Sequence, residues 1–288
     1  MIPANVIEIV TPKNFVLNGL WFGPLQPKRV IIFVHGLFSS AFSSSLVSIV
    51  NALIDDETAA ITFSNRGHDT VADVKQRVGM ERKYHRFGTA HEVFEDCIDD
   101  IEGAMRVARK EGAKNIYLAG HSTGCQKIAY FTSKARNKPR GLILLGPLSD
   151  YASERKKPKL RHAAALAKRM VKAEKSHELL PEDAWSHYVD AQRFLSLYAA
   201  DSVEEIFSYS QPNKRPKTYQ SIQIPVLALF AGDDEYAERP ARKLVEWFKE
   251  NSQSKKFEAK IIERVGHSFS GGEEQVVLAI YKWIKNIK

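Results

Sequence analysis

Asn115-Ile-Tyr-Leu-Ala-Gly-His-Ser-Thr-Gly-Cys-Gln126 carries the strongest structural signal in the chain. An apolar strand is predicted over residues 116–119, and it runs through the pattern Gly-x-Ser-x-Gly into a helix predicted over residues 125–136. A serine on such a turn projects its hydroxyl into the open, and the helix N-terminus beneath it favours developing negative charge. Gly120 and Gly124 let strand and helix approach closely. Ser122 is therefore a candidate nucleophile. The alternative is that this segment is a glycine-rich loop with no catalytic role.

Apolar strands and amphipathic helices alternate on both sides of this segment. Strands are predicted over 6–10, 15–22, 30–34, 60–63, 116–119, 141–145, 226–230 and 257–262, and helices over 43–54, 89–110, 125–136, 239–251 and 273–287. The alternation predicts an α/β fold with a mainly parallel, doubly wound sheet and helices on both faces. The first two strands, with Pro12 and Asn14 between them, are expected to form an antiparallel hairpin.

The alternation breaks between residues 150 and 219. This stretch is basic, has a helical pattern and contains no convincing strand, and Pro212, Pro216 and Pro225 punctuate its end. It lies between two predicted core strands, where an insertion would leave the sheet intact. We therefore expect a core formed by residues 1–149 and 220–288, with residues 150–219 inserted as a helical cap.

A general base for Ser122 is expected near the C-terminus. In hydrolases built on this kind of strand-to-helix turn, the chain order is serine, acid, histidine. His267 fits that order, because it follows the last predicted strand and precedes the last helix. His68, on the loop after an earlier strand, is the nearest competitor. Of the remaining histidines, His121 is expected to point away from the serine beside it.

The acid is expected on the loop after the strand over residues 226–230. Asp233, Asp234 and Glu235 are adjacent there. Asp234 is the first choice because it lies in an Asp-x-x-small pattern that leads into the helix. Its role would be to hold the imidazole tautomer and stabilise the imidazolium. Asp233 and Glu235 remain alternatives.

The loop Val34-His-Gly-Leu-Phe38 follows the first core strand and is the candidate partner of the serine turn. Its Leu37 N–H, together with the Thr123 N–H, would form an oxyanion hole, and each such donor is typically worth on the order of 10²–10³ in rate. His35 is expected to order this loop and not to transfer protons.

With these motifs in place, the chain resembles the α/β-hydrolase family over essentially its whole length. Gly120–Gln126, Arg66-Gly-His-Asp69 and Pro147-Leu-Ser-Asp150 resemble a branch that includes fungal siderophore esterases. Arg66-Gly-His68 also resembles monoacylglycerol-lipase-like and cinnamoyl-esterase-like members. The acid loop departs from the commonest family spacing, being one residue tighter after its glycine.

The resemblance implies hydrolysis of a carboxylic ester through an acyl-enzyme, with no metal and no organic cofactor. The same residues would serve an amide or peptide hydrolase or an acyltransferase. A non-catalytic binding protein with this fold is a third possibility. The sequence leaves the acyl group, the alcohol and the oligomeric state open.

Positive charge is concentrated in the predicted cap. Of a formal net charge of +8, the segment from Glu154 to Lys175 holds nine lysines and arginines against Glu154 and Glu174. The functional interpretation is a cap that favours anionic substrates or anionic lipid surfaces. The alternative is a solvated helix face. Nucleic-acid binding is not expected, because no aromatic residues are interleaved and no nucleic-acid motif is present.

Several further expectations concern location and metals. Cys97 and Cys125 are the only cysteines, which favours a reducing cytoplasm over a disulfide framework. No apolar run is long enough for a membrane span, and the N-terminal residues do not form a secretory signal. Asp96, Asp99 and Asp100 are expected to lie on a solvated helix face and not to bind a metal.

Overall fold

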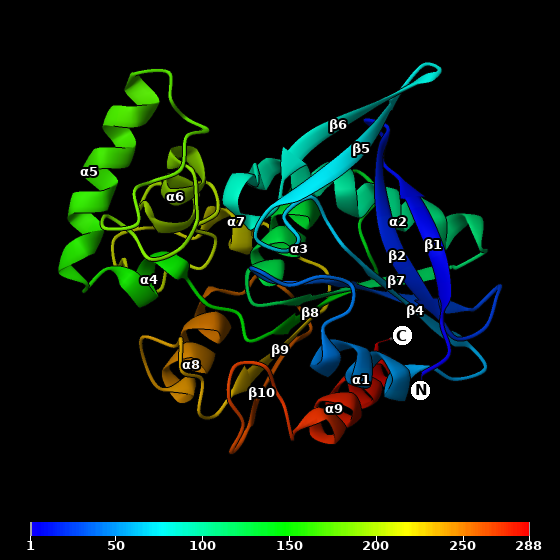
Figure 1. Cartoon of the computed structure of the whole chain (residues 1–288). Coiled ribbons are helices and arrows are strands. Elements are labelled where there is room, and N and C mark those ends of the chain that lie inside the picture. Colours follow the sequence, from blue (N-terminus) through cyan, green and yellow to red (C-terminus); the bar gives the residue numbers. More distant parts are fainter. Residues whose placement is uncertain (1, 288) are drawn as a thin grey trace.

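The computed structural model describes residues 2–287, which form a ten-stranded sheet flanked by helices (Figure 1). The strands are β1 (Asn5–Val10), β2 (Phe15–Phe22), β3 (Arg29–Val34), β4 (Thr58–Phe63), β5 (Ala72–Val78), β6 (Glu81–Phe87), β7 (Asn115–His121), β8 (Gly141–Leu145), β9 (Val226–Ala231) and β10 (Phe257–Ile262). The helices are α1 (Ser44–Leu53), α2 (Cys97–Lys110), α3 (Thr123–Lys134), α4 (Asp150–Glu154), α5 (Pro158–Lys172), α6 (Ala191–Tyr198), α7 (Lys217–Gln220), α8 (Ala241–Asn251) and α9 (Glu273–Asn286). No helix within this range has the length and apolar composition to cross a bilayer.

The sheet order confirms the predicted fold class. The strands run β10-β9-β8-β7-β3-β4-β2-β5-β6, and β1 pairs with β2. Every pair from β10 to β4 is parallel, whereas β2 pairs antiparallel with β1, β4 and β5. The N-terminal hairpin is therefore present, and its turn contains Asn14 with a positive φ of 66°. In the parallel part, the carboxyl ends of the strands lie along one edge, which is where active sites of such sheets form.

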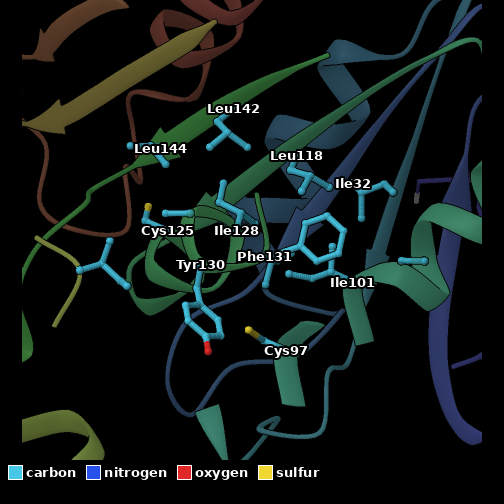
Figure 2. Packing of buried hydrophobic residues seen from close by; sticks show 14 of the residues in the cluster. Ile32, Cys97, Ile101, Leu118, Cys125, Ile128, Tyr130, Phe131, Leu142 and Leu144 are labelled. Carbon is cyan, nitrogen blue, oxygen red and sulfur yellow. The ribbon is translucent and has the colours of Figure 1, made fainter. Parts of the chain in front are cut away.

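Helices on both faces bury alternate residues of the strands. In β3, Val30, Ile32 and Val34 belong to one apolar cluster and Ile31 and Phe33 to another. This alternation is the period of two that a strand covered on both sides requires. The first cluster is shared with α2, α3 and α8 and the second with α1 and α9. Figure 2 shows the first, where Ile101, Cys125, Ile128 and Phe131 pack against the sheet.

Two segments differ from the sequence-based prediction. β5 and β6 form an antiparallel hairpin that extends the sheet beyond β2, as Figure 1 shows. The residues of this hairpin are mostly polar and exposed, so the sequence has no alternation of apolar residues that would predict the two strands. The helix predicted from residue 89 begins only at Cys97, because 89–91 and 94–96 form separate short 3₁₀ turns.

Residues 150–199 contain α4, α5 and α6 and bury an apolar cluster of their own. Leu160, Ala163 and Ala167 of α5 pack there against Trp185 and Phe194. Opposite this apolar face, α5 exposes cationic side chains to solvent: Arg161, Lys168, Arg169 and Lys172. Beyond this cluster, residues such as Ile206 and Phe207 pack in the core of the sheet. The division into a core and a cap over 150–219 stays a prediction.

Candidate active site

Ser122 lies on a strained turn at the carboxyl end of β7. Its φ of 55° and ψ of −127° fall in a region that L-residues rarely adopt. The turn needs glycine on both sides of it. A Cβ on Gly120 would lie 2.4 Å from the carbonyl oxygen of Gly124, and one on Gly124 would lie 2.1 Å from that of Val34. The local sequence thus holds the serine directly on the N-terminus of α3.

His267 lies on the loop between β10 and α9 and bonds to one of the three adjacent carboxylates. Its Nδ1 is 2.8 Å from Asp234 Oδ2, and both side chains are largely buried. The backbone N–H of His267 donates to Glu235 Oε2 at 2.8 Å. Asp233 instead contributes its backbone, whose N–H donates to Val265 O. Among these three residues, only Asp234 therefore meets the imidazole ring, and Glu235 fixes the backbone beneath it.

Ser122 and His267 line one cavity of about 280 Å³. Serine side chains, histidines and two carboxylic acids dominate its wall, whose residues are Gly36, Leu37, Phe38, Ser39, Ser43, Ser45, His121, Ser122, Leu148, Asp150, Ser153, Glu154, His187, Tyr198, Tyr236, His267 and Ser268. Within residues 2–287, no hydrogen bond joins the Ser122 hydroxyl to the imidazole. In ligand-free hydrolases such bonds are often long and tighten only when substrate is bound.

The loop after β3 approaches the serine so closely that it requires a glycine. A Cβ on Gly36 would lie 2.7 Å from Ser122 Cβ. His35 orders this loop as expected: its Nδ1 lies 2.8 Å from Gly36 O and its Nε2 accepts from Asn65 N at 3.2 Å. Burial lowers the His35 pKa to about 3, with help from the nearby Lys127 cation, so the ring is neutral.

The two predicted oxyanion donors occupy different environments. Leu37 lines the cavity, whereas Thr123 is fully buried at the first turn of α3. Neither backbone N–H donates a hydrogen bond to another described residue. Both remain candidates as donors to a developing oxyanion.

His121 was expected to point away from the serine, but it lines the same cavity. Its Nε2 lies 2.9 Å from the His267 carbonyl oxygen, and the two rings are 4.9 Å apart. Because a carbonyl only accepts, His121 donates from Nε2 in this bond. Burial lowers the His121 pKa to about 4. His121 thus braces the His267 loop, a role that its place beside Ser122 in the sequence did not reveal.

The aspartates of α2 correct another expectation. Asp99 and Asp100 are buried and do not lie on a solvated face, because both pair with the buried Arg66. Arg66 Nε lies 2.7 Å from Asp100 Oδ1, and its Nη2 and Nη1 lie 3.0 Å from Asp99 and 3.2 Å from Asp96. Burial raises the Asp100 pKa to about 6 despite this guanidinium. The cluster anchors the loop after β4, on which Arg66 lies.

A second buried ionic cluster joins α3 to α6. Lys127 of α3 pairs with Glu92 Oε1, and Arg193 of α6 lies 2.8 Å from Glu92 Oε2 and also pairs with Glu204. Lys127 Nζ is in addition 3.5 Å from Oδ1 of Asn65. The lysine and arginine hold the Glu92 pKa below its usual range, although burial opposes them. No sequence pattern predicted this cluster, because its members come from distant segments.

Comparison with solved structures places the chain among proteins of the α/β-hydrolase fold, as the sequence predicted. Siderophore hydrolase EstB from Aspergillus fumigatus superimposes with a TM-score of 0.72 at 16% identity, over 100% of this chain and 99% of EstB. Est1E from Butyrivibrio proteoclasticus, with ferulic acid bound, gives 0.65 at 17% identity over 96% and 97%. Carboxylesterase CesB from Bacillus subtilis gives 0.55 at 20% identity over 98% and 92%.

The sequence itself was compared with curated proteins and with family models. No curated protein matches it. One family model, described as "Protein of unknown function (DUF1749)", matches residues 28–286. Since this match spans nearly the whole chain, the protein is a member of the DUF1749 family.

Proposed function

We propose that the chain is a serine hydrolase that cleaves carboxylic esters through an acyl-enzyme. Ser122 would be the nucleophile, His267 its general base and Asp234 the residue that orients the imidazole. The observation that carries the proposal is one cavity lined both by the strained Ser122 and by an imidazole that is bonded to a buried carboxylate. That the structural neighbours named above include a siderophore hydrolase and a carboxylesterase supports it.

The mechanism follows from these positions. His267 Nε2 takes the proton of Ser122 as the hydroxyl oxygen bonds to the acyl carbon, and the carbonyl oxygen becomes an oxyanion. The N–H groups of Leu37 and Thr123 would stabilise that charge. The carbon–oxygen bond to the alcohol then breaks, and the alcohol leaves with the proton from His267. Water, deprotonated by the same imidazole, attacks the acyl-enzyme and releases the acid.

The cavity bears on the kind of ester. At about 280 Å³ it suits a small molecule, and α4 and Tyr198 close one side of it. We therefore propose residues 150–219 as a cap over the site. No lysine or arginine is among the described residues that line the cavity. The lysines and arginines of α5 lie on the solvent-exposed face of that helix. A cytoplasmic location is also proposed, because Cys97 and Cys125 are buried free thiols.

A fluorophosphonate probe tests the proposal directly. We expect it to label the wild-type protein and to leave Ser122→Ala unlabelled, with Ser133→Ala as a matched control elsewhere in the fold that keeps full labelling. Hydrolysis of p-nitrophenyl esters of graded chain length should disappear in the same variant. Equal labelling of wild type and Ser122→Ala would remove the serine from the nucleophile role, and labelling without ester turnover would favour an amide hydrolase or acyltransferase.

A further inference from the structure

The helix α4 forms an acidic and polar wall of the cavity. Asp150, Ser153 and Glu154 are separated by three and four residues, which places them on one side of the helix. All three line the cavity that contains Ser122. The substrate of the proposed reaction would therefore lie against this wall.

Among residues 2–287, no lysine or arginine lines the cavity. Glu154 already pairs with Lys157, an exposed lysine 2.7 Å away, which leaves Asp150 as the acidic group of the wall to consider. Asp150 has no ion-pair partner among residues 2–287, and its Oδ2 accepts a hydrogen bond from Gln126 Nε2 at 2.9 Å. Gln126 is itself only 1% exposed, and its Oε1 is buried without a partner. Gln126 is not among the residues that line the cavity, so the hydrogen-bonding capacity open to a ligand there is that of Asp150.

The surroundings of Asp150 are predominantly negative. The titratable and charged groups near it are Glu154 on its own helix, Arg193 and Tyr198 on α6, and Glu204, Glu205 and Tyr209 after α6. Arg193 is already engaged by Glu92 and Glu204. Burial and then the charge of Glu204 raise the Asp150 pKa to about 8, so this carboxyl group is mostly protonated at neutral pH.

We infer that the α4 wall is a subsite for a cationic group of the substrate, an ammonium or amine on the acyl or alcohol part of the ester. The inference rests on the proposed function, because it assumes that the ester is cleaved in this cavity. An ammonium group supplies the positive charge that Asp150 lacks and donates a hydrogen bond to it. Its binding favours the ionised form of Asp150, so one proton is released to solvent as the cation binds.

Esters that differ only in charge test the inference. Methyl 5-aminopentanoate, methyl hexanoate and monomethyl adipate place a cation, a methyl group and an anion at similar distances from the ester carbonyl. Acetylcholine and 3,3-dimethylbutyl acetate make the same comparison on the alcohol side. We expect kcat/KM in at least one series to favour the cation over its neutral counterpart by roughly tenfold or more, as hydrogen bonds to charged groups allow, and to disfavour the anion.

Two variants then test whether the preference for the cationic ester arises from the α4 wall. Asp150→Asn keeps the size of the side chain and should reduce the ratio of kcat/KM for cationic over neutral ester to near one. Asp183→Asn makes the same substitution at an exposed position outside the cavity and should leave the ratio unchanged. Thermal unfolding of both variants checks that each is folded.

A second test uses the wild-type protein alone and measures how the ratio of kcat/KM for cationic over neutral ester changes with pH. The ionised fraction of a carboxyl group with a pKa of about 8 increases from about a tenth at pH 7 to about nine tenths at pH 9, so the preference should rise about tenfold over that range. Any pH dependence of the proposed general base cancels in the ratio, because both esters depend on the same base.

The outcomes separate this inference from the proposed function. If both series are hydrolysed in a Ser122-dependent way without any preference for the cation, the subsite is refuted and the hydrolase stands. If no ester is hydrolysed, the proposed function fails and butylammonium binding, measured by calorimetry, decides the subsite. Binding that weakens at least tenfold in Asp150→Asn supports it, whereas no binding to the wild type overturns it.

Discussion

Replacing Asp234 with asparagine isolates the contribution of one carboxylate to the candidate site. Asp234 Oδ2 is 2.8 Å from His267 Nδ1, and its side chain is 6% exposed, so water has little access to replace the lost interaction. An asparagine amide at this position can donate to Nδ1 and then stabilises the tautomer whose proton sits on Nε2. That proton blocks the lone pair needed to deprotonate Ser122. By the analogy of serine hydrolases, kcat should fall on the order of 10³–10⁴-fold, which corresponds to about 4–5.5 kcal/mol of transition-state stabilisation.

Two matched variants on the same loop make the experiment specific. Glu235→Gln keeps an oxygen that accepts from the His267 backbone N–H and should cost roughly tenfold or less. Asp233→Asn should have little effect, because this residue contributes only a backbone hydrogen bond in the described part of the chain. Steady-state hydrolysis of p-nitrophenyl butyrate, with the fraction of active protein titrated by a fluorophosphonate, gives kcat for all three. A larger loss in Glu235→Gln than in Asp234→Asn would refute this assignment of the acid.

Three further predictions concern the scaffold of the site. Gly124→Ala forces a Cβ to within 2.1 Å of the Val34 carbonyl oxygen, a backbone atom, so urea unfolding should show a loss of about 1–3 kcal/mol or more together with lost probe labelling. Glu92→Gln removes the negative charge that faces two buried cations and should lower the free energy of unfolding by about 3–5 kcal/mol. The control Glu95→Gln, at an exposed position, should change the free energy of unfolding little. Similar losses in both variants would contradict the reasoning. His35 has a pKa lowered from 6.5 to about 3, so the unfolded chain takes up this proton first as pH falls. The stability of the wild type should therefore decrease below pH 6.5, by about 2 kcal/mol from this residue at pH 5, and His35→Gln should lack that component of the decrease in chemical-denaturation profiles.

The parts of the site that follow local rules could be predicted from the sequence. The turn around Ser122 needs an apolar strand, two glycines and a helix in immediate succession, and all of these are local. His267 could be found because chain order and loop position restricted the choice. The sequence favours Asp234 but leaves its two neighbours as alternatives, because the choice depends on the loop orientation set by the pairing of Asp233 N with Val265 O.

The parts that depend on long-range pairing could not be predicted. Asp99 and Asp100 look like the solvated side of an amphipathic helix, because their partner Arg66 lies more than thirty residues earlier. Asp150 is a comparable case. Its position after Ser149 marks only a helix start, whereas its pKa is raised first by burial and then by the charge of Glu204, which belongs to a separate segment. Charge alone therefore misleads wherever burial and a distant partner determine the role of the residue.

The buried ionic groups between α3 and α6 also explain why Asp150 lacks a cation. Lys127 and Arg193 face Glu92 and Glu204, so two positive and two negative charges balance within this cluster. Moving either cation toward Asp150 would leave a buried carboxylate unpaired, which costs several kcal/mol. Burial, and then the charges of Glu204 and Glu205, raise the Asp150 pKa to about 8 against the opposing charge of Arg193, so the protonated carboxyl is the favoured form near neutral pH. A positive charge that enters the cavity meets no lysine or arginine among the described lining residues, which is the physical basis for expecting the ligand to bring the charge that Asp150 lacks.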